Sequence, residues 1–172
     1  MKDRIVFITG ASSGIGLGCA RKFASQGASL ILNARNVTVL EDIKKELETK
    51  YATRVLLLPF DVRNRDEVAK ALTSLSQEWQ AVDVLINNAG LVIGLDKEHQ
   101  GNLDEWDVVI DTNIKGLLTV TRLLVPGMVE RGRGHIINIG SIAGDGAYPG
   151  GSVYCATKAA VKALSDDLRI DL

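Results

Sequence analysis

The sequence has few cysteines and histidines, the residues that supply thiolate and imidazole ligands to metal ions and, for cysteine, form disulfide bonds. Its 172 residues include two cysteines, Cys19 and Cys155, and two histidines, His99 and His135. No CxxC pair or other metal-ligand spacing is present, so we expect no metal site. Cysteines this sparse and this far apart favour a reduced, cytoplasmic setting.

Long apolar runs and an excess of charge of one sign are also missing. No stretch is long enough to span a bilayer, and a strand-like run that begins at Ile5 leaves no room for a signal peptide. The 20 basic and 21 acidic residues give a formal net charge of -1. This balance argues against nucleic acid or an anionic membrane surface as a partner.

Short apolar runs alternate with longer amphipathic ones along the whole chain. The predicted strands, rich in Val, Ile and Leu on both faces as buried parallel strands are, cover 5–8, 29–33, 55–59, 84–86 and 135–139. The predicted helices cover 14–26, 39–50, 66–77, 103–130 with an interruption near Pro126, and about 151 to the end.

This alternation predicts an α/β fold with a Rossmann-type doubly wound parallel sheet and helices on both faces. No strand follows the last predicted helix. We therefore expect residues 1–172 to form a single dinucleotide-binding catalytic domain that is truncated at its C-terminus and lacks the final strands.

A glycine-rich segment follows the first predicted strand and leads into a helix. Glycines permit a tight turn and close approach to a ligand, and a helix start offers free N–H groups to a pyrophosphate. The residues predicted to bind a dinucleotide here are Gly10, Ser12, Ser13, Gly14, Ile15 and Gly16. The alternative is a plain turn in which the serines cap the helix.

The end of the second predicted strand indicates which dinucleotide is bound. An acidic residue at this place would favour NAD, but the chain has Arg35 and Asn36 and no carboxylate. Arg35 can meet a 2′-phosphate with charge-assisted hydrogen bonds, so we predict NADP as the cofactor. A solvated surface arginine is the alternative.

Tyr154 and Lys158 are spaced so that they share one face of a helix. An ammonium group stabilises a nearby phenolate, and such a pair can exchange a proton with an alcohol or carbonyl while a hydride is transferred. Ser141 follows the fifth predicted strand, where it either hydrogen-bonds the reacting oxygen or is a turn serine. Asn113, mid-helix, indicates either a kink that holds a water molecule or a solvent-facing side chain.

The chain carries, in this order, the motifs Thr9-Gly10-x3-Gly14-x-Gly16, Asp61-Val62, Asn87-Asn88-Ala89-Gly90, Asn113, Ser141 and Tyr154-x3-Lys158. Together these motifs resemble the classical short-chain dehydrogenase/reductase family. The resemblance implies that Tyr154 is the general acid/base and that Lys158 assists it and holds the nicotinamide ribose. It also implies that Ser141 orients the substrate oxygen and that Asn113 holds a water molecule in a proton relay.

The resemblance carries further expectations about the cofactor and about assembly. Asp61 and Val62 would contact the adenine edge, although Asp61 could instead cap the helix that follows it. The segment from Asn87 to Gly90, with Asn87, Ala89 and Gly90 as its cofactor-binding residues, would line the adenosine side, or would merely form a turn after the strand. The resemblance also suggests a homodimer or homotetramer assembled through the two long helices, and the alternative is that these helices are buried against the chain's own sheet.

Several segments look like those of NADP-dependent 3-hydroxy acid dehydrogenases, among them 32–35, 111–113 and 135–141. This resemblance implies a small substrate such as serine or allo-threonine. Two other functions stay open. One is an NADPH-dependent reductase of a ketoacyl, sugar or steroid carbonyl. The other is a non-catalytic NADP-binding protein, which could dispense with Tyr154 or Lys158, yet this chain retains both.

Overall fold

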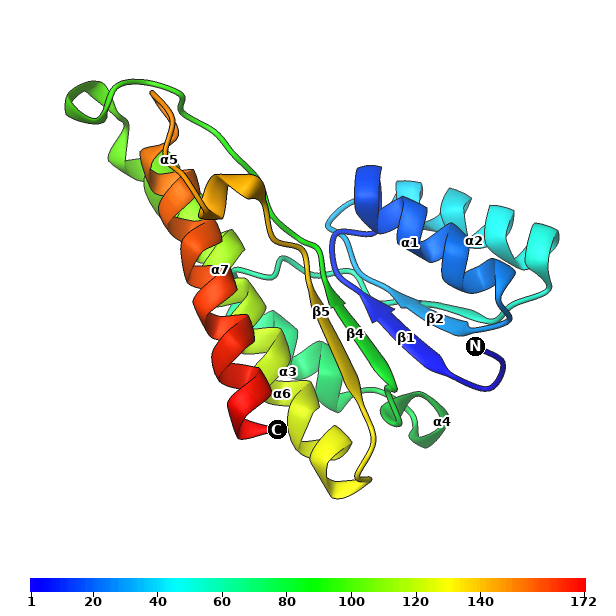
Figure 1. Cartoon of the computed structure of the whole chain (residues 1–172). Coiled ribbons are helices and arrows are strands. Elements are labelled where there is room, and N and C mark those ends of the chain that lie inside the picture. Colours follow the sequence, from blue (N-terminus) through cyan, green and yellow to red (C-terminus); the bar gives the residue numbers. More distant parts are fainter.

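A computed structural model describes residues 1–172 and contains a five-stranded parallel sheet with helices on both faces (Figure 1). The strands are β1 (Ile5–Ile8), β2 (Ser29–Leu32), β3 (Val55–Leu57), β4 (Val84–Asn87) and β5 (His135–Asn138), and their order in the sheet is β3-β2-β1-β4-β5. The structure confirms all five predicted strands and the predicted doubly wound α/β architecture.

Seven α-helices connect or flank the strands. They are α1 (Gly14–Ser25), α2 (Val37–Tyr51), α3 (Arg65–Thr73), α4 (Gln77–Gln80), α5 (Leu103–Ile110), α6 (Leu117–Glu130) and α7 (Ser152–Asp171). The prediction of one helix over 66–77 was wrong, because α3 ends at Thr73 and α4 is separate. The Thr73 and Ser74 hydroxyls donate to backbone carbonyls of the preceding turn, and such bonds compete with helix continuation.

The long helix predicted over 103–130 is interrupted around Asn113, where a kink was one of the two alternatives, and not near Pro126. Helix α6 continues through Pro126, which lies on its exposed side. The interruption is instead a π-helical segment, Asp111–Gly116, which joins α5 to α6. Gly116 packs closely here, since a Cβ atom on it would lie 2.8 Å from Val62 Cγ2. Single π-helical turns of this kind occur frequently at functional sites.

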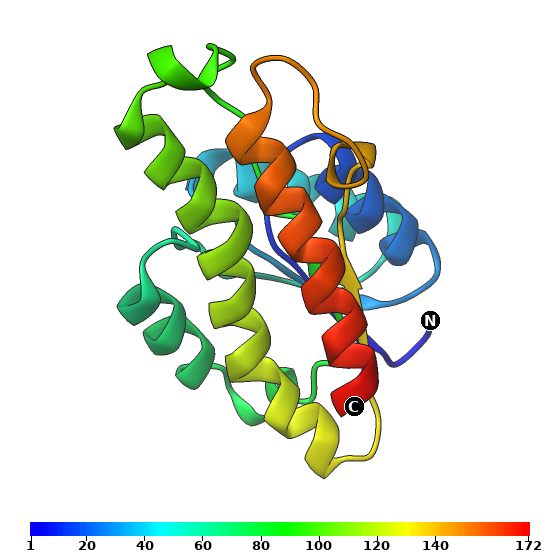
Figure 2. The ribbon, with the colours of Figure 1, turned by 60° about the vertical axis from the view of Figure 1, so that its left-hand side comes forward.

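Alternate side chains of the strands fill two separate cores. On β1, Val6 and Ile8 face α1 and α2, whereas Ile5 and Phe7 face α3 and α6. Figure 2 shows α6 and α7 running side by side on the face of the sheet that α3 also covers. Helix α7 packs on α5 and on the π-helical segment.

None of the helices combines the length with the apolar composition that crossing a bilayer requires.

The order of the strands fixes where a ligand can bind. The chain runs outward from β1 to β2 and β3, then crosses back to β4 and β5 on the other side of β1. A crevice forms at such a reversal, outside the carboxyl ends of the central strands. The glycine-rich segment follows β1 and the Asn87–Gly90 segment follows β4, so the fold brings these two motifs together.

Candidate active site

A cavity of about 510 Å³ opens at the carboxyl edge of the sheet, and segments that follow all five strands line it. Among the residues predicted to form a site, those in its lining are Gly10, Ser12, Ser13, Gly14, Ile15, Arg35, Asp61, Val62, Ala89, Gly90, Tyr154 and Lys158. Five predicted residues lie outside the lining: Gly16, Asn36, Asn87, Asn113 and Ser141.

The turn after β1 is close-packed backbone that only glycine permits. Gly10 has a φ of +64°, and a Cβ atom on it would lie 2.9 Å from Ala89 Cα. A Cβ atom on Gly16 would lie 2.3 Å from the Gly10 carbonyl oxygen. Gly16 therefore supports the turn from beneath, which explains why it does not itself line the cavity.

The start of α1 leaves its hydrogen-bond donors available. Ser13 occupies the N-cap position, but its side chain makes no capping hydrogen bond, so the capping alternative was wrong for this residue. The first N–H groups of α1 have no partner within the helix, as at every helix start. Together with the partial positive charge of the helix end, they form a site suited to an anion.

Asn88, which the sequence analysis included only as part of the Asn87–Gly90 motif, ties this turn to the end of β4. Its Nδ2 donates to the carbonyl oxygens of Thr9 and Gly10 at 3.0 and 2.9 Å. Asn87 points to the opposite face, where its Nδ2 donates to Thr121 Oγ1 and Asn138 Oδ1 at 2.9 Å. The contact predicted for Asn87 therefore falls to Asn88. The alternation of side chains along β4 could have indicated this, since Asn87 shares its face with Leu85.

The segment after β2 places one of its two predicted residues in the cavity. Arg35 is exposed, lines the cavity and makes no hydrogen bond or ion pair. Asn36 instead caps α2, because its side chain accepts a hydrogen bond from Val39 N at 3.1 Å. Asn33, which was not predicted, donates from Nδ2 to the carbonyl oxygens of Leu58 and Phe60 and ties the ends of β2 and β3 together.

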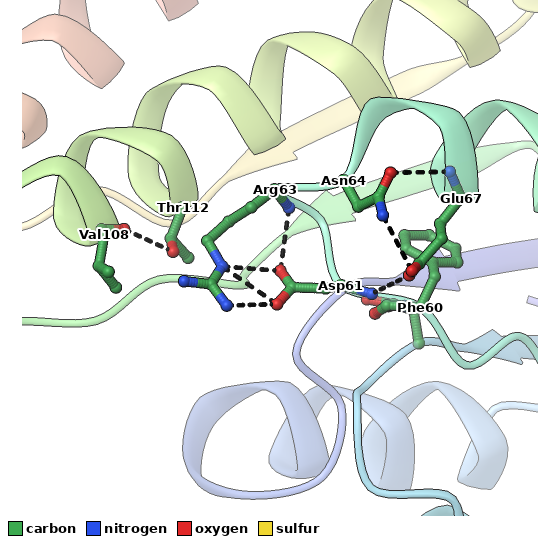
Figure 3. Close-up of polar contacts among 8 residues, drawn as sticks. Phe60, Asp61, Arg63, Asn64, Glu67, Val108 and Thr112 are labelled. Atoms are coloured by element: carbon green, nitrogen blue, oxygen red, sulfur yellow. Dashed lines mark hydrogen bonds and ion pairs between the residues drawn. The ribbon is translucent and has the colours of Figure 1, made fainter.

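Asp61 lies beside an arginine that the sequence analysis missed (Figure 3). Arg63 Nη2 lies 2.6 Å from Asp61 Oδ2, and Arg63 Nε lies 3.0 Å from each carboxylate oxygen. These hydrogen bonds hold the pKa of the Asp61 carboxyl below its ordinary value, and the charge of Arg35 adds to the effect. Asn64, not Asp61, caps α3, so the capping alternative for Asp61 was wrong.

The pKa of the Asp61 carboxyl gives a direct test of this pair. In the Arg63→Gln variant we expect that pKa to rise toward the ordinary value of 3.8, measured by carbon NMR of the carboxyl group. A carboxyl with a lowered folded-state pKa stabilises the fold at neutral pH, and this stabilisation is lost as pH falls from 3.8 through the folded value. The variant should lose part of that acid sensitivity. A control variant, Arg65→Gln, should leave the titration of Asp61 unchanged.

Tyr154 and Lys158 lie one turn apart on α7 and both line the cavity. Lys158 Nζ is 5.8 Å from the centre of the Tyr154 ring and donates to the Ile139 carbonyl oxygen at 2.8 Å. Burial of the ammonium group lowers the pKa of Lys158, whose exposed fraction is 8%. A phenol next to a buried ammonium group can donate or accept a proton at a ligand in the cavity.

Asn113 is buried in the π-helical segment, so the solvent-facing alternative was wrong. Its Oδ1 accepts from Leu91 N at 2.9 Å, and its Nδ2 donates to Leu91 O at 2.9 Å and to Thr157 Oγ1 at 3.1 Å. The amide thereby joins the loop after β4 to α7. Gly90 lies close by, since a Cβ atom on it would be 3.2 Å from Asn113 Oδ1 and 3.7 Å from Lys158 Nζ.

Ser141 is the N-cap of the 3₁₀ turn Ile142–Gly144, and its Oγ accepts from Ala143 N at 3.1 Å. This geometry is that of the turn serine considered above. The turn packs tightly on α7, because a Cβ atom on Gly144 would lie 2.8 Å from the Lys158 carbonyl oxygen. Contact between Ser141 and a substrate stays a prediction.

The fold and this set of residues agree with comparisons to known proteins. Residues 4–172 match the model of the family described as short chain dehydrogenase. The chain therefore belongs to the short chain dehydrogenase family. The family resemblance inferred from the motifs is confirmed.

Particular relatives narrow the comparison. The chain is 48% identical over 168 residues to the NADP-dependent 3-hydroxy acid dehydrogenase YdfG of Salmonella typhi. The match covers 98% of this chain and 66% of that protein. The structure of this chain resembles the crystal structure of serine dehydrogenase from Escherichia coli, with 46% identity, a TM-score of 0.92, and coverage of 98% and 76% of the two chains.

A further solved structure is the closed form of serine dehydrogenase complexed with NADP⁺. The two chains are 45% identical with a TM-score of 0.91, and the match covers 98% of this chain and 66% of the other. The chain thus spans just under two thirds of the length of the Salmonella typhi relative and of this second structure.

Proposed function

We propose that the protein is an NADP-dependent oxidoreductase of the short chain dehydrogenase family, built on a single dinucleotide-binding catalytic domain. It transfers a hydride between NADP(H) and the alcohol or carbonyl of a small 3-hydroxy acid such as serine or allo-threonine. The observation that carries this proposal is a single cavity that extends from the glycine turn and Arg35 to Tyr154 and Lys158. The names of the similar dehydrogenases support the choice of cofactor and substrate.

The residues present fit a dinucleotide with a 2′-phosphate. The N–H groups at the start of α1 and the hydroxyls of Ser12 and Ser13 suit the pyrophosphate. The turn that presents them needs glycine at Gly10, because a Cβ atom there would overlap Ala89. Arg35, which has no partner in the protein, suits the 2′-phosphate. Asp61 would accept from the adenine edge. When bound, the nicotinamide supplies or accepts the hydride.

The chain's own residues handle the proton. The Tyr154 hydroxyl gives a proton to the substrate oxygen in reduction and takes it back in oxidation. The Lys158 ammonium stabilises the phenolate that this leaves and can donate to the nicotinamide ribose. Ser141 would hold the substrate oxygen by its hydroxyl. Asn113, through its bonds to Leu91 and Thr157, would position a water molecule that relays the proton.

Oxidation of hydroxy acids tests the proposal. With the full-length protein, NADP⁺ should be reduced in the presence of serine, allo-threonine or 3-hydroxybutyrate, measured as appearance of NADPH by absorbance. NAD⁺ at the same concentration should react more slowly, because it offers no phosphate to Arg35. A parallel panel of ketoacyl, sugar and steroid carbonyls tests the alternative reductases. Turnover only on that panel, or a clear preference for NAD⁺, contradicts the specific proposal.

Two further features belong to the proposed working state. The two distant cysteines, neither in a disulfide bond, suit the cytoplasm. Assembly into a homodimer or homotetramer would use the α5–α6 and α7 surfaces. Exposed apolar side chains there support this, among them Leu118 and Leu123 on α6 and the small Ala156 and Ala159 on α7.

A further inference from the structure

The charged groups of the cavity are unequally distributed. Arg35 follows β2, and Asp61 and Arg63 follow β3. Lys158 lies on α7, which follows β5 at the opposite edge of the sheet. Asp61 is the one carboxylate in the lining. Whether Arg35 has an uncompensated negative charge beside it therefore depends on whether another group neutralises Asp61.

Arg63 neutralises Asp61 by direct contact. Its backbone N–H, Nε–H and Nη2–H all donate to the carboxylate, at 2.6 to 3.0 Å (Figure 3). The Nε–H group is shared between the two carboxylate oxygens, so each oxygen accepts from two N–H groups of Arg63. The Arg63 guanidinium thus offsets the negative charge of Asp61 at hydrogen-bonding distance.

The loop that carries the pair is fixed by its own hydrogen bonds. Asn64 N donates to the Asp61 carbonyl oxygen at 2.9 Å, and the Asn64 side chain caps α3. Glu67 accepts from Asn64 Nδ2 at 2.9 Å and from Asp61 N at 3.3 Å. The ion pair therefore does not have to be assembled when a ligand binds, which reduces the ordering cost of binding.

The Arg35 guanidinium has no ion-pair partner because Asp61 is already paired with Arg63. Arg35 forms no ion pair, although its charge acts on Asp61 and helps to lower the pKa of that carboxyl. Without Arg63, Asp61 would be an ionised carboxylate beside the place where Arg35 meets a phosphate. It would repel the phosphate and would compete with it for the Arg35 guanidinium.

We infer that Arg63 is a specificity-determining residue that favours NADP over NAD by neutralising Asp61 and leaving Arg35 free for the 2′-phosphate. This inference rests on the proposed function. It concerns a residue that acts through Asp61 and Arg35, so its effect must appear in the ratio of two affinities. If Arg63 had a merely structural role, its loss would weaken the binding of NADP⁺ and of NAD⁺ by the same factor.

Binding of the two oxidised dinucleotides, measured calorimetrically on the full-length protein without substrate, tests this inference. Arg63→Gln is expected to lower the preference for NADP⁺ over NAD⁺ by about tenfold, with most of the change in the NADP⁺ affinity. The matched control is Arg65→Gln, an exposed arginine two positions later that does not line the cavity. Its preference should stay within about threefold of the unaltered protein.

A double variant shows whether the effect passes through Asp61. In an Asp61→Asn background no carboxylate is left to neutralise, so adding Arg63→Gln should change the preference by less than about threefold. A tenfold effect that persists there means that Arg63 acts directly on the phosphate, which overturns the inference. An equal loss for both dinucleotides, or an unchanged ratio, in Arg63→Gln also overturns it.

If Arg63→Gln does not fold, Asp61→Asn alone is the test, and it should keep or increase the preference for NADP⁺. A fall in that preference contradicts the inference. If the unaltered protein binds neither dinucleotide, the proposed function fails as well. If the unaltered protein prefers NADP⁺ but the variants keep its ratio, only the role of Arg63 fails.

Discussion

Replacing Tyr154 by phenylalanine is expected to lower kcat for hydroxy acid oxidation by about 10²–10⁴-fold, the usual contribution of a general acid/base. The substitution removes one hydroxyl and keeps the ring that lies 5.8 Å from Lys158 Nζ. The NADP⁺ dissociation constant should therefore stay within about threefold. Steady-state kinetics and a calorimetric titration measure the two quantities.

Tyr51→Phe is the matched control for this experiment. Tyr51 ends α2 and does not line the cavity, so loss of its hydroxyl should leave kcat unchanged. An equal fall in kcat for both variants would show that the loss is not specific to the cavity. Full activity of Tyr154→Phe would remove Tyr154 from the proton transfer altogether.

Replacing Gly16 by alanine is expected to weaken NADP⁺ binding by about 10- to 100-fold. The new methyl group would lie 2.3 Å from the Gly10 carbonyl oxygen and 2.5 Å from Asn88 Nδ2. Relieving that overlap must move the turn or Asn88, which anchors the turn just after β4. Overpacking of this kind costs about 1–3 kcal/mol, which corresponds to the expected loss of affinity if the strain falls on the bound state.

Gly18→Ala separates crowding from the general effect of an added methyl group. Gly18 lies on the same helix two residues later, and no atom lies within 4 Å of the Cβ position. Its NADP⁺ affinity should stay within about threefold of the unaltered protein, and its helix should be slightly more stable. Equal affinities for the two variants would contradict the account of the turn.

Much of the fold could be predicted because single elements carry strong local signals. The five strands are short runs of Val, Ile and Leu, and each was predicted to within two residues of either end. Their alternation with helices indicates parallel pairing. The glycine spacing after β1 placed the turn, because few other residues tolerate that backbone.

The errors have specific physical causes. Pro126 predicted an interruption, but a proline on the exposed side of a helix can be accommodated, so α6 continues. The π-helical segment carries tertiary contacts, namely the three hydrogen bonds of Asn113 to residues in the loop after β4 and in α7. No local pattern carries that information, although an asparagine in a helix interior did mark the place.

Residue roles at the site depended on which way a side chain points. Asn87 and Asn88 are adjacent and identical in type, yet only Asn88 faces the glycine turn. Asn36 and Arg35 differ in the same way, since one caps α2 and the other lines the cavity. Arg63 was missed because its importance comes from contact with Asp61, which the order of residues does not reveal.

A structure of the full-length protein with bound NADP⁺ tests the central claim most directly, because it locates each part of the dinucleotide in the cavity. We predict the pyrophosphate at the start of α1, the 2′-phosphate on Arg35, and the nicotinamide ring beside Tyr154 and Lys158. NADP⁺ bound elsewhere, or bound with its 2′-phosphate away from Arg35 and its nicotinamide away from Tyr154, would contradict the account.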